Sequence, residues 1–338
     1  MITKIQKINS QSLREAKELI QSGQLVAFPT ETVYGLGALA TDESAVKRVF
    51  EAKGRPSDNP LIVHVHRDYD IYTLVEKGND YAEKIANAFL PGPLTMVYKS
   101  KGVVAKNLSC GLDTLAVRIP QSEEAQRFLK YVNLPIAAPS ANISKHISPV
   151  TAQHVYSDFN GKIPLILDGG RCVGGIESTV LDVTGEFPVI LRKGLITAEM
   201  IKEVVGECFY ASENVSGKVS SPGMKYKHYS PNCETKVFER NQVGEAIAFY
   251  DELEKSGKKV AFLTDGFMAE LLGDRNLLNL GKTGEEMALN LYNLLHVGEE
   301  NYQYLITFKL EVNSEVMLSV NNRFSKAFFK EGCDSNNG

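Results

Sequence analysis

The sequence has no tryptophan, no closely spaced pair of cysteines and no long apolar run. Its 5 cysteines are scattered and odd in number, which argues against a disulfide framework and against a zinc site. No stretch approaches the roughly 20 apolar residues that a membrane-spanning helix needs. The first residues alternate charged and apolar side chains and lack the features of a signal peptide. We therefore expect a cytoplasmic protein with reduced thiols and no membrane segment.

Positive charge is not in excess either. The formal net charge is -4, which argues against a wide basic face that neutralises many phosphates of a nucleic acid. Any contact with RNA is therefore expected to be local or transient, and stable direct binding of tRNA is not predicted.

Several well-known catalytic motifs are absent. The sequence has no G-x-G-x-x-G, no G-x-S-x-G, no H-E-x-x-H and no calcium-binding loop of the D-x-D-x-D-G type. Gly281, Lys282 and Thr283 imitate the end of a P-loop, but Asn276 stands where its first glycine belongs, so we interpret them as a helix start. Without an obvious protein nucleophile or metal site, we expect a reaction between two bound substrates, which the protein promotes by positioning them and by stabilising charge.

The 338 residues are too many for a single typical core, so two domains are expected. Over residues 1–205, short β-rich runs alternate irregularly with helical segments, which predicts a mixed, twisted α+β sheet. Ser12 and Glu15 have the spacing of a capping box at the first helix. Residues 206–232 are rich in Ser, Gly and Pro and predict a linker. Residues 233–338 alternate strand and helix regularly, which predicts a smaller Rossmann-like α/β domain.

Two polar loops follow strands in the first half of the chain. PTETVYGLG (29–37) places hydroxyls and two glycines at the end of a buried strand, as either a site for a small polar ligand or an ordinary turn. Lys53 and Arg55, two residues apart before a proline-stiffened loop, are either preorganised cations for a triphosphate or a solvated turn. His64 lies inside the next strand and points either to a cleft or to solvent.

Three later motifs extend this pattern. Arg118 lies inside an apolar strand and needs a carboxylate, which is either an internal Asp or Glu or part of a ligand. APSANIS (138–144) offers hydroxyl and amide groups suited to phosphate or ribose oxygens, or to a helix cap. The glycine-rich segment before Ser178 is either a further wall of a pocket or a flexible hairpin.

Taken in order, these segments carry a resemblance. PTETVYGLG, KGRPSDNPLIVH, PGPLT, LAVRIP, APSAN, DGG with ESTV, and SPGMKYKHYSP together closely resemble the YrdC-type threonylcarbamoyl-AMP synthases, in the long form with an extra C-terminal domain. The resemblance covers residues from about 10 to 232. Several linked motifs in one order are far more specific than any one of them.

The resemblance implies a nucleotidyltransferase that makes L-threonylcarbamoyladenylate and pyrophosphate from L-threonine, bicarbonate and ATP. The product would serve threonylcarbamoyladenosine modification of tRNA beside the anticodon, with the downstream tRNA transferase components as functional partners. It also implies a curved mixed sheet with flanking helices around a cationic cavity. Mg²⁺ would arrive with ATP, and no protein metal site is expected.

Matched motif by motif, the resemblance also implies which residues bind the two substrates. Lys53 and Arg55 would be the catalytic residues. ATP would be bound by Lys53, Arg55, Asn59, Thr114, Ser140, Asn142, Ser148, Arg192 and Tyr229, and L-threonine by Thr32, His64, Arg118, Ala138 and Ser178. The linker, with His228 and Tyr229, would close over the cavity as a lid.

Two other classes of function stay open at this point. One is a noncatalytic RNA-binding or nucleotide-binding module, against which the net charge weighs. The other is a carbamoyl-transfer domain like that of hydrogenase-maturation proteins. The sequence departs from the family pattern at Lys145, where a glycine is common, and this leaves the rigidity of the 144–148 loop in question.

Overall fold

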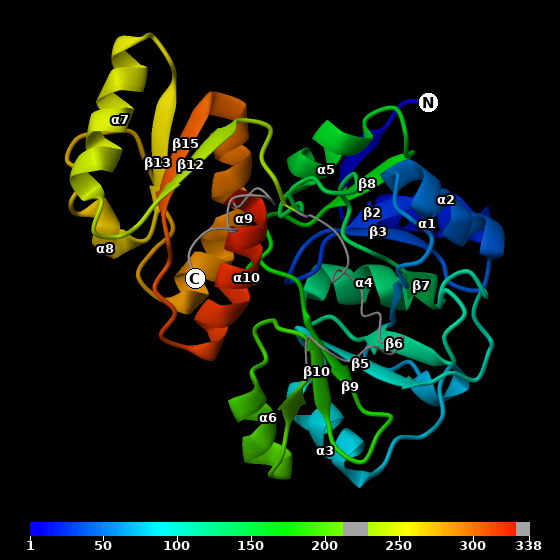
Figure 1. Ribbon diagram of the computed structural model, residues 1–338. Coiled ribbons are helices and arrows are strands. Elements are labelled where there is room, and N and C mark those ends of the chain that lie inside the picture. Colours follow the sequence, from blue (N-terminus) through cyan, green and yellow to red (C-terminus); the bar gives the residue numbers. More distant parts are fainter. Residues whose placement is uncertain (212–228, 329–338) are drawn as a thin grey trace. The chain divides into compact units, whose positions relative to one another are not determined.

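The computed structural model describes residues 1–211 and 229–328, which form two compact units, each built around its own sheet (Figure 1). Among these described residues, no helix combines the length and the apolar character that crossing a membrane requires.

The sheet of the first unit has 11 strands, and their order in space differs from their order in sequence. From one edge to the other they are β1 (Lys4–Lys7), β8 (Leu165–Asp168), β2 (Val26–Phe28), β3 (Gly35–Leu39), β7 (Ile136–Ala137), β4 (Ile62–His64), β6 (Thr114–Arg118), β5 (Leu94–Lys99), β9 (Thr179–Asp182), β10 (Val189–Arg192) and β11 (Phe209–Tyr210). Parallel pairs such as β4 with β6 alternate with antiparallel pairs such as β5 with β6. The prediction of a mixed α+β sheet is confirmed.

Six α-helices and one short 3-10 helix accompany this sheet among the described residues. They are α1 (Ser10–Gln21), α2 (Glu43–Lys53), η1 (Ile71–Thr73), α3 (Asp80–Phe89), α4 (Glu123–Val132), α5 (Ala152–Phe159) and α6 (Ala198–Val205). The capping prediction for α1 is wrong by one turn, because Asn9 is the N-cap and Ser12 is its partner at the third helical position. Asn9 accepts hydrogen bonds from the backbone N–H groups of Gln11 and Ser12, which a Ser12 cap would have left exposed.

The main core of the first unit lies where α1 and α4 cover β2, β8 and β7. Apolar side chains spaced three and four residues apart, such as Leu13, Ala16 and Ile20, form the buried face of α1. Phe128 of α4 packs against Phe28 of β2, with ring centroids 4.9 Å apart. This core fixes the end of β2, from which the first polar loop leaves.

The second unit has a four-stranded sheet in the order β12 (Glu234–Phe238), β15 (Tyr304–Phe308), β13 (Val260–Thr264) and β14 (Leu277–Asn279), and all neighbouring pairs are parallel. Figure 1 shows α7 (Val243–Lys255) and α8 (Gly266–Ala269) on one side of this sheet, and α9 (Gly284–Asn301) and α10 (Glu315–Phe328) on the other. The predicted Rossmann-like alternation is confirmed. Thr283 caps α9 through a capping box with Glu286, so the GKT motif is a helix start, as predicted.

The segment that the sequence assigns to a linker does not begin as loop. Phe209 and Tyr210 pair in parallel with Val189 and Ile190 and add the last strand to the first sheet. Their apolar, aromatic side chains suit a strand better than the Ser- and Gly-rich residues that follow. Residues 212–228, including the predicted lid residue His228, lie outside the described part of the chain.

The core packing of α4 generates a stability prediction. Phe128→Ala removes a ring that is fully buried against Phe28, so it should lower the free energy of unfolding by about 3–5 kcal/mol. Tyr131→Ala on the exposed side of the same helix should cost less than about 1 kcal/mol. Urea unfolding followed by circular dichroism measures both, and equal effects of the two changes would contradict this account of the core.

Candidate active site

The predicted ligand residues of the first unit gather on consecutive strands of its sheet. Most of them lie on, or within a few residues of, β3, β7, β4, β6, β9 and β10, which follow one another in the sheet except that β5 lies between β6 and β9. Residues from sequence positions as distant as 32 and 192 are therefore brought to one stretch of the sheet. The exceptions are Lys53, which ends α2, Ser148, which follows the loop after β7, and Tyr229 of the second unit.

Lys53 ties two predicted loops together. The helix α2 ends here because Gly54 adopts a left-handed conformation, with φ 58°. The Lys53 side chain is only 2% exposed, and its Nζ donates to the backbone carbonyls of Ser140, at 2.6 Å, and of Asn142. Burial, and then the charge of Arg55, hold the pKa of Lys53 well below its usual value. A nearby anion would favour the charged form of this amine.

The loop after β7 is held in place by further hydrogen bonds. Ser140 Oγ donates to Asn142 Oδ1 at 2.6 Å, and Ser144 N donates to the carbonyl of Lys53 at 2.8 Å. Asp158 of α5 accepts from Ile143 N at 2.8 Å. Polar groups from this loop are therefore presented beside Lys53 in a fixed conformation.

Lys145, the position where the family pattern has glycine, has a φ of 77°. This left-handed conformation is free of strain for glycine and costly for other residues. The substitution has kept the backbone conformation that a glycine would favour.

Arg55 and Asn59 occupy the turn before β4. Arg55 Nη2 donates to the Asn59 carbonyl at 3.2 Å. The Asn59 side chain is 2% exposed, and its Oδ1 has no hydrogen-bond partner among the described residues. A buried amide oxygen without a partner carries a free-energy cost, and at a binding site a ligand or water can remove that cost.

Arg118, at the end of β6, has an internal partner. Its Nη2 lies 2.7 Å from Glu31 Oε1, and the two side chains are only 4% and 8% exposed. The sequence left an internal acid and a ligand carboxylate as alternatives, and the structure supplies the internal acid. Arg118 Nη1, however, makes no hydrogen bond to any described residue.

His64 and Thr95 flank Arg118 in the sheet. The backbone register places His64 of β4 opposite Arg118 on one side and Thr95 of β5 opposite it on the other. Burial, together with the adjacent Arg118 charge, lowers the pKa of His64 to about 3, so the imidazole is neutral at physiological pH. His64 is buried, so of the two predicted orientations, solvent is excluded.

A chain of hydrogen bonds leads from β5 to β10. The hydroxyls of Thr95 and Ser178 lie 2.8 Å apart. Arg192 Nη2 donates to the carbonyl of Ser178 at 2.8 Å and also approaches its Oγ, at 3.2 Å. Ser178, predicted for threonine, and Arg192, predicted for ATP, are therefore in direct contact.

Thr32, Ala138 and Ser148 complete the predicted set near these loops. Thr32 is buried, with its Oγ1 2.9 Å from Thr30 Oγ1. Ala138 N donates to the carbonyl of Ile62 at 2.9 Å, which fixes the end of β7 against β4. Ser148 Oγ donates to the buried carboxylate of Glu177 at 2.7 Å.

Thr114 and Tyr229 have other surroundings, each within its own unit. Thr114 begins β6, at the opposite end of that strand from Arg118, on the side where β4 begins after Asn59. Tyr229 packs within the second unit, with its ring 5.1 Å from that of Tyr292 on α9.

Sequence reasoning missed several groups that hold the site. Glu31, Thr95, Asp158 and Glu177 fix Arg118, Ser178, the 140–144 loop and Ser148 respectively. The need of Arg118 for a carboxylate was a usable signal, and Glu31 was one of the acids within the motifs already chosen. Thr95 and Asp158 gave no such signal, because their partners are distant in sequence.

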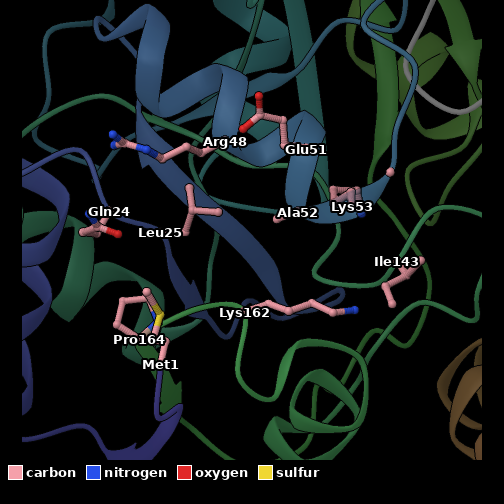
Figure 2. Close-up of a pocket in the computed structure, with 11 residues that line it drawn as sticks. Met1, Gln24, Leu25, Arg48, Glu51, Ala52, Lys53, Ile143, Lys162 and Pro164 are labelled. Carbon is pink, nitrogen blue, oxygen red and sulfur yellow. The ribbon is translucent and has the colours of Figure 1, made fainter.

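Two hollows adjoin these residues in the first unit. A cavity of about 660 Å³ lies against α2 and is lined by Arg48, Glu51 and Lys53 on one side and by Ile143 and Lys162 on the other (Figure 2). Lys53 is the only predicted ligand residue in its lining. A smaller cavity of about 420 Å³ reaches Thr30 and Glu31. No group of three or more His, Cys, Asp or Glu side chains among the described residues could hold a metal ion.

Comparison with known proteins covers both units. Residues 18–194 match the Sua5, YciO and YrdC family described as telomere recombination, and residues 196–328 match the threonylcarbamoyl-AMP synthase C-terminal domain. The threonylcarbamoyl-AMP synthase of Pyrococcus abyssi is 43% identical over 334 residues, 95% of each chain. That of Bacillus subtilis is 38% identical over 326 residues, 94% of this chain and 93% of its own.

A solved structure agrees with these sequence matches. The crystal structure of P. abyssi Sua5 complexed with L-threonine superposes with a TM-score of 0.83, at 40% identity, over 96% of each chain. The agreement extends over both units, so it includes the second unit that distinguishes the long form. The chain belongs to the threonylcarbamoyl-AMP synthase family.

Proposed function

We propose that the chain forms L-threonylcarbamoyladenylate and pyrophosphate from L-threonine, bicarbonate and ATP, with both substrates bound around Lys53 and Arg118. The observation that carries this proposal is the continuity of the polar groups across neighbouring strands of one sheet, from the Lys53 loops to Arg192. Two anionic substrates could lie side by side there. The product would supply the modification of tRNA beside the anticodon.

The ATP half of the site would be built mainly from the end of α2, residues 140–144 and Ser148, all in the first unit. Lys53 and Arg55 would hold the triphosphate and stabilise the charge on the leaving pyrophosphate. The remaining ATP ligands offer hydroxyls, amides and one guanidinium, and are Asn59, Thr114, Ser140, Asn142, Ser148 and Arg192. Mg²⁺ would arrive with ATP and would help to neutralise the charge of the triphosphate beside Lys53 and Arg55.

The threonine half would surround Arg118. Its Nη1, which has no partner among the described residues, would bind the carboxylate of threonine. The remaining threonine ligands, Thr32, His64, Ala138 and Ser178, are all buried in the first unit. A neutral His64 would contact the substrate without adding a second positive charge next to Arg118.

The chemistry requires no protein nucleophile. Bicarbonate would lose water to give carbon dioxide, and the amine of threonine would capture it and release a proton. The resulting carbamate oxygen would then attack the α-phosphorus of ATP and displace pyrophosphate, with the enzyme holding the two in line. The thiol of Cys172 is hydrogen-bonded to the backbone of Thr30, beside Glu31. Burial raises the pKa of this thiol to about 12. It is therefore protonated at physiological pH and is a poor nucleophile.

We further propose that the first unit through β11 is the catalytic domain, that residues 233–338 are an accessory domain, and that the residues between them serve as the linker. Cytoplasmic transferases that consume the product would be the functional partners.

The cationic role of Lys53 is tested by replacing it. Lys53→Ala removes both the charge and the bonds to Ser140 and Asn142, so ATP-dependent pyrophosphate release should fall by about 100-fold or more. Lys47→Ala, on the same helix with a side chain 73% exposed, is the matched control and should leave the rate unchanged. Near-normal activity of Lys53→Ala would count against the assignment.

Substrate analogues test whether threonine is the amino acid. Serine lacks the methyl group and should react about 10- to 200-fold less efficiently, whereas valine lacks the hydroxyl and should lose on the order of 10⁴-fold. The measurement is pyrophosphate release with each amino acid, with ATP and bicarbonate present. Release that proceeds equally without any amino acid would refute the proposed reaction.

The buried, neutral His64 predicts a dependence of stability on pH. The unfolded chain protonates His64 below about pH 6.5, whereas the folded chain does so only near pH 3, so stability is lost as the pH falls between these values. The contribution is about 1.4 kcal/mol per pH unit. His64→Gln should therefore show a shallower fall in unfolding free energy from pH 6.5 to 5 in urea titrations. Identical slopes for the variant and the wild type would contradict the neutral, buried assignment.

A further inference from the structure

We propose that Glu31 is a positioning residue that orients Arg118 for the carboxylate of threonine and thereby sets the preference of the site for an amino acid with a free carboxylate. The proposal rests on the assignment of Arg118 to threonine made above. Glu31 itself is not among the residues implied to bind either substrate.

Glu31 joins four separate segments of the first unit. Its Oε1 accepts from Arg118 Nη2 at 2.7 Å. Its Oε2 accepts from the backbone N–H groups of Gln121 and Ser122, at 3.0 and 3.4 Å, directly before α4. Its own backbone carbonyl accepts from Gly174 N at 2.6 Å, which fixes the glycine-rich loop against it.

The backbone of Glu31 is held as firmly as its carboxylate. Thr30 Oγ1 accepts from the N–H groups of Thr32, at 3.1 Å, and Val33, at 3.2 Å, and so closes the turn on either side of Glu31. The side chain is therefore aimed by its own loop rather than by Arg118 alone. Such preorganisation is what a group that orients another group requires.

These contacts determine which nitrogen of the Arg118 guanidinium can still bind a substrate. Nη2 is bonded to Glu31, and Nε donates to the carbonyl of Gly92 at 3.4 Å. Two fixed nitrogens set the plane of a rigid guanidinium, and the remaining amino group, Nη1, makes no bond to a described residue. We infer that Nη1 is the group presented to the ligand.

The pattern of donors around Glu31 makes a carboxylate necessary. One oxygen faces the Arg118 guanidinium and the other faces two backbone N–H groups, so every neighbour of the carboxylate is a donor. A glutamine has one oxygen and one NH₂ group, and in either orientation its NH₂ opposes a donor. Glu31→Gln should therefore displace Arg118 with little change in side-chain volume.

The test compares two ligands that differ at the carboxylate. Calorimetry would measure the affinities of L-threonine and of L-threonine amide, whose carboxylate is replaced by a neutral amide, for the full chain saturated with a nonhydrolysable ATP analogue. The wild type should prefer threonine by about 10- to 100-fold, the worth of a charge-assisted hydrogen bond. In Glu31→Gln this preference should fall to within about twofold, while the affinity for the ATP analogue changes little.

A matched control exists in the second unit. Asp265 also accepts from an arginine, Arg240, with one oxygen, and from backbone N–H groups at a helix start, those of Phe267 and Met268, with the other. Asp265→Asn disrupts the same kind of contact and should leave the preference for threonine over its amide at the wild-type value.

The possible failures are distinguishable. If Glu31→Gln weakens both ligands equally and keeps the wild-type preference, Glu31 has only a structural role and the inference is wrong. If the wild type binds threonine and its amide equally, the assignment of Arg118 is itself wrong. Should Glu31→Gln not fold, Glu31→Asp serves in its place, because it keeps the charge but is one methylene too short to reach both partners; an unchanged preference there would also overturn the proposal.

Discussion

A charged group inside a protein must have compensating partners, and this constraint governs the first unit more than any other. Lys53 and Arg118 are both nearly fully buried, and each would be very costly alone. Each is compensated by a loop that comes from a distant part of the chain: Lys53 by the carbonyls of Ser140 and Asn142, and Arg118 by Glu31. The contacts that stabilise these two buried side chains are therefore the same contacts that hold the loops together.

The mixed sheet explains why these loops can meet. In a parallel α/β sheet the carboxyl ends of strands share one edge, whereas here β4 and β6 run parallel while β7 and β5 run against them. The strands are short, with only three residues in β4, so polar residues before and after a strand are separated by a short span of chain. Loops entering and leaving the sheet can then contribute to one site. The arginines at these strand ends, Arg118 and Arg192, would suit the carboxylate of threonine and the phosphates of ATP.

The sequence predicted the architecture well because hydrophobic patterning is local. The irregular strand pattern of the first unit, the regular alternation of the second and the helix start at Thr283 are all read from neighbouring residues. The site residues have hydrogen-bond partners that are distant in sequence, and the local hydrophobic pattern does not predict which residues these partners are. Thr95 meets Ser178 and Asp158 meets Ile143 only because of the strand order and the packing of α5, which no spacing in the sequence reveals. Capping of α1 by Asn9 shows the same limit at short range, since Asn9 and Ser12, one helical turn apart, are both residue types that can cap a helix.

The central claim is that Arg118 and Lys53 mark the two halves of one site. A crystal structure of the chain with L-threonine and a nonhydrolysable ATP analogue tests it most directly. The account predicts the threonine carboxylate at about 3 Å from the guanidinium of Arg118 and the triphosphate on Lys53 and Arg55, with the amine of threonine facing the α-phosphate. Threonine bound away from Arg118, or a triphosphate that contacts neither Lys53 nor Arg55, would contradict it.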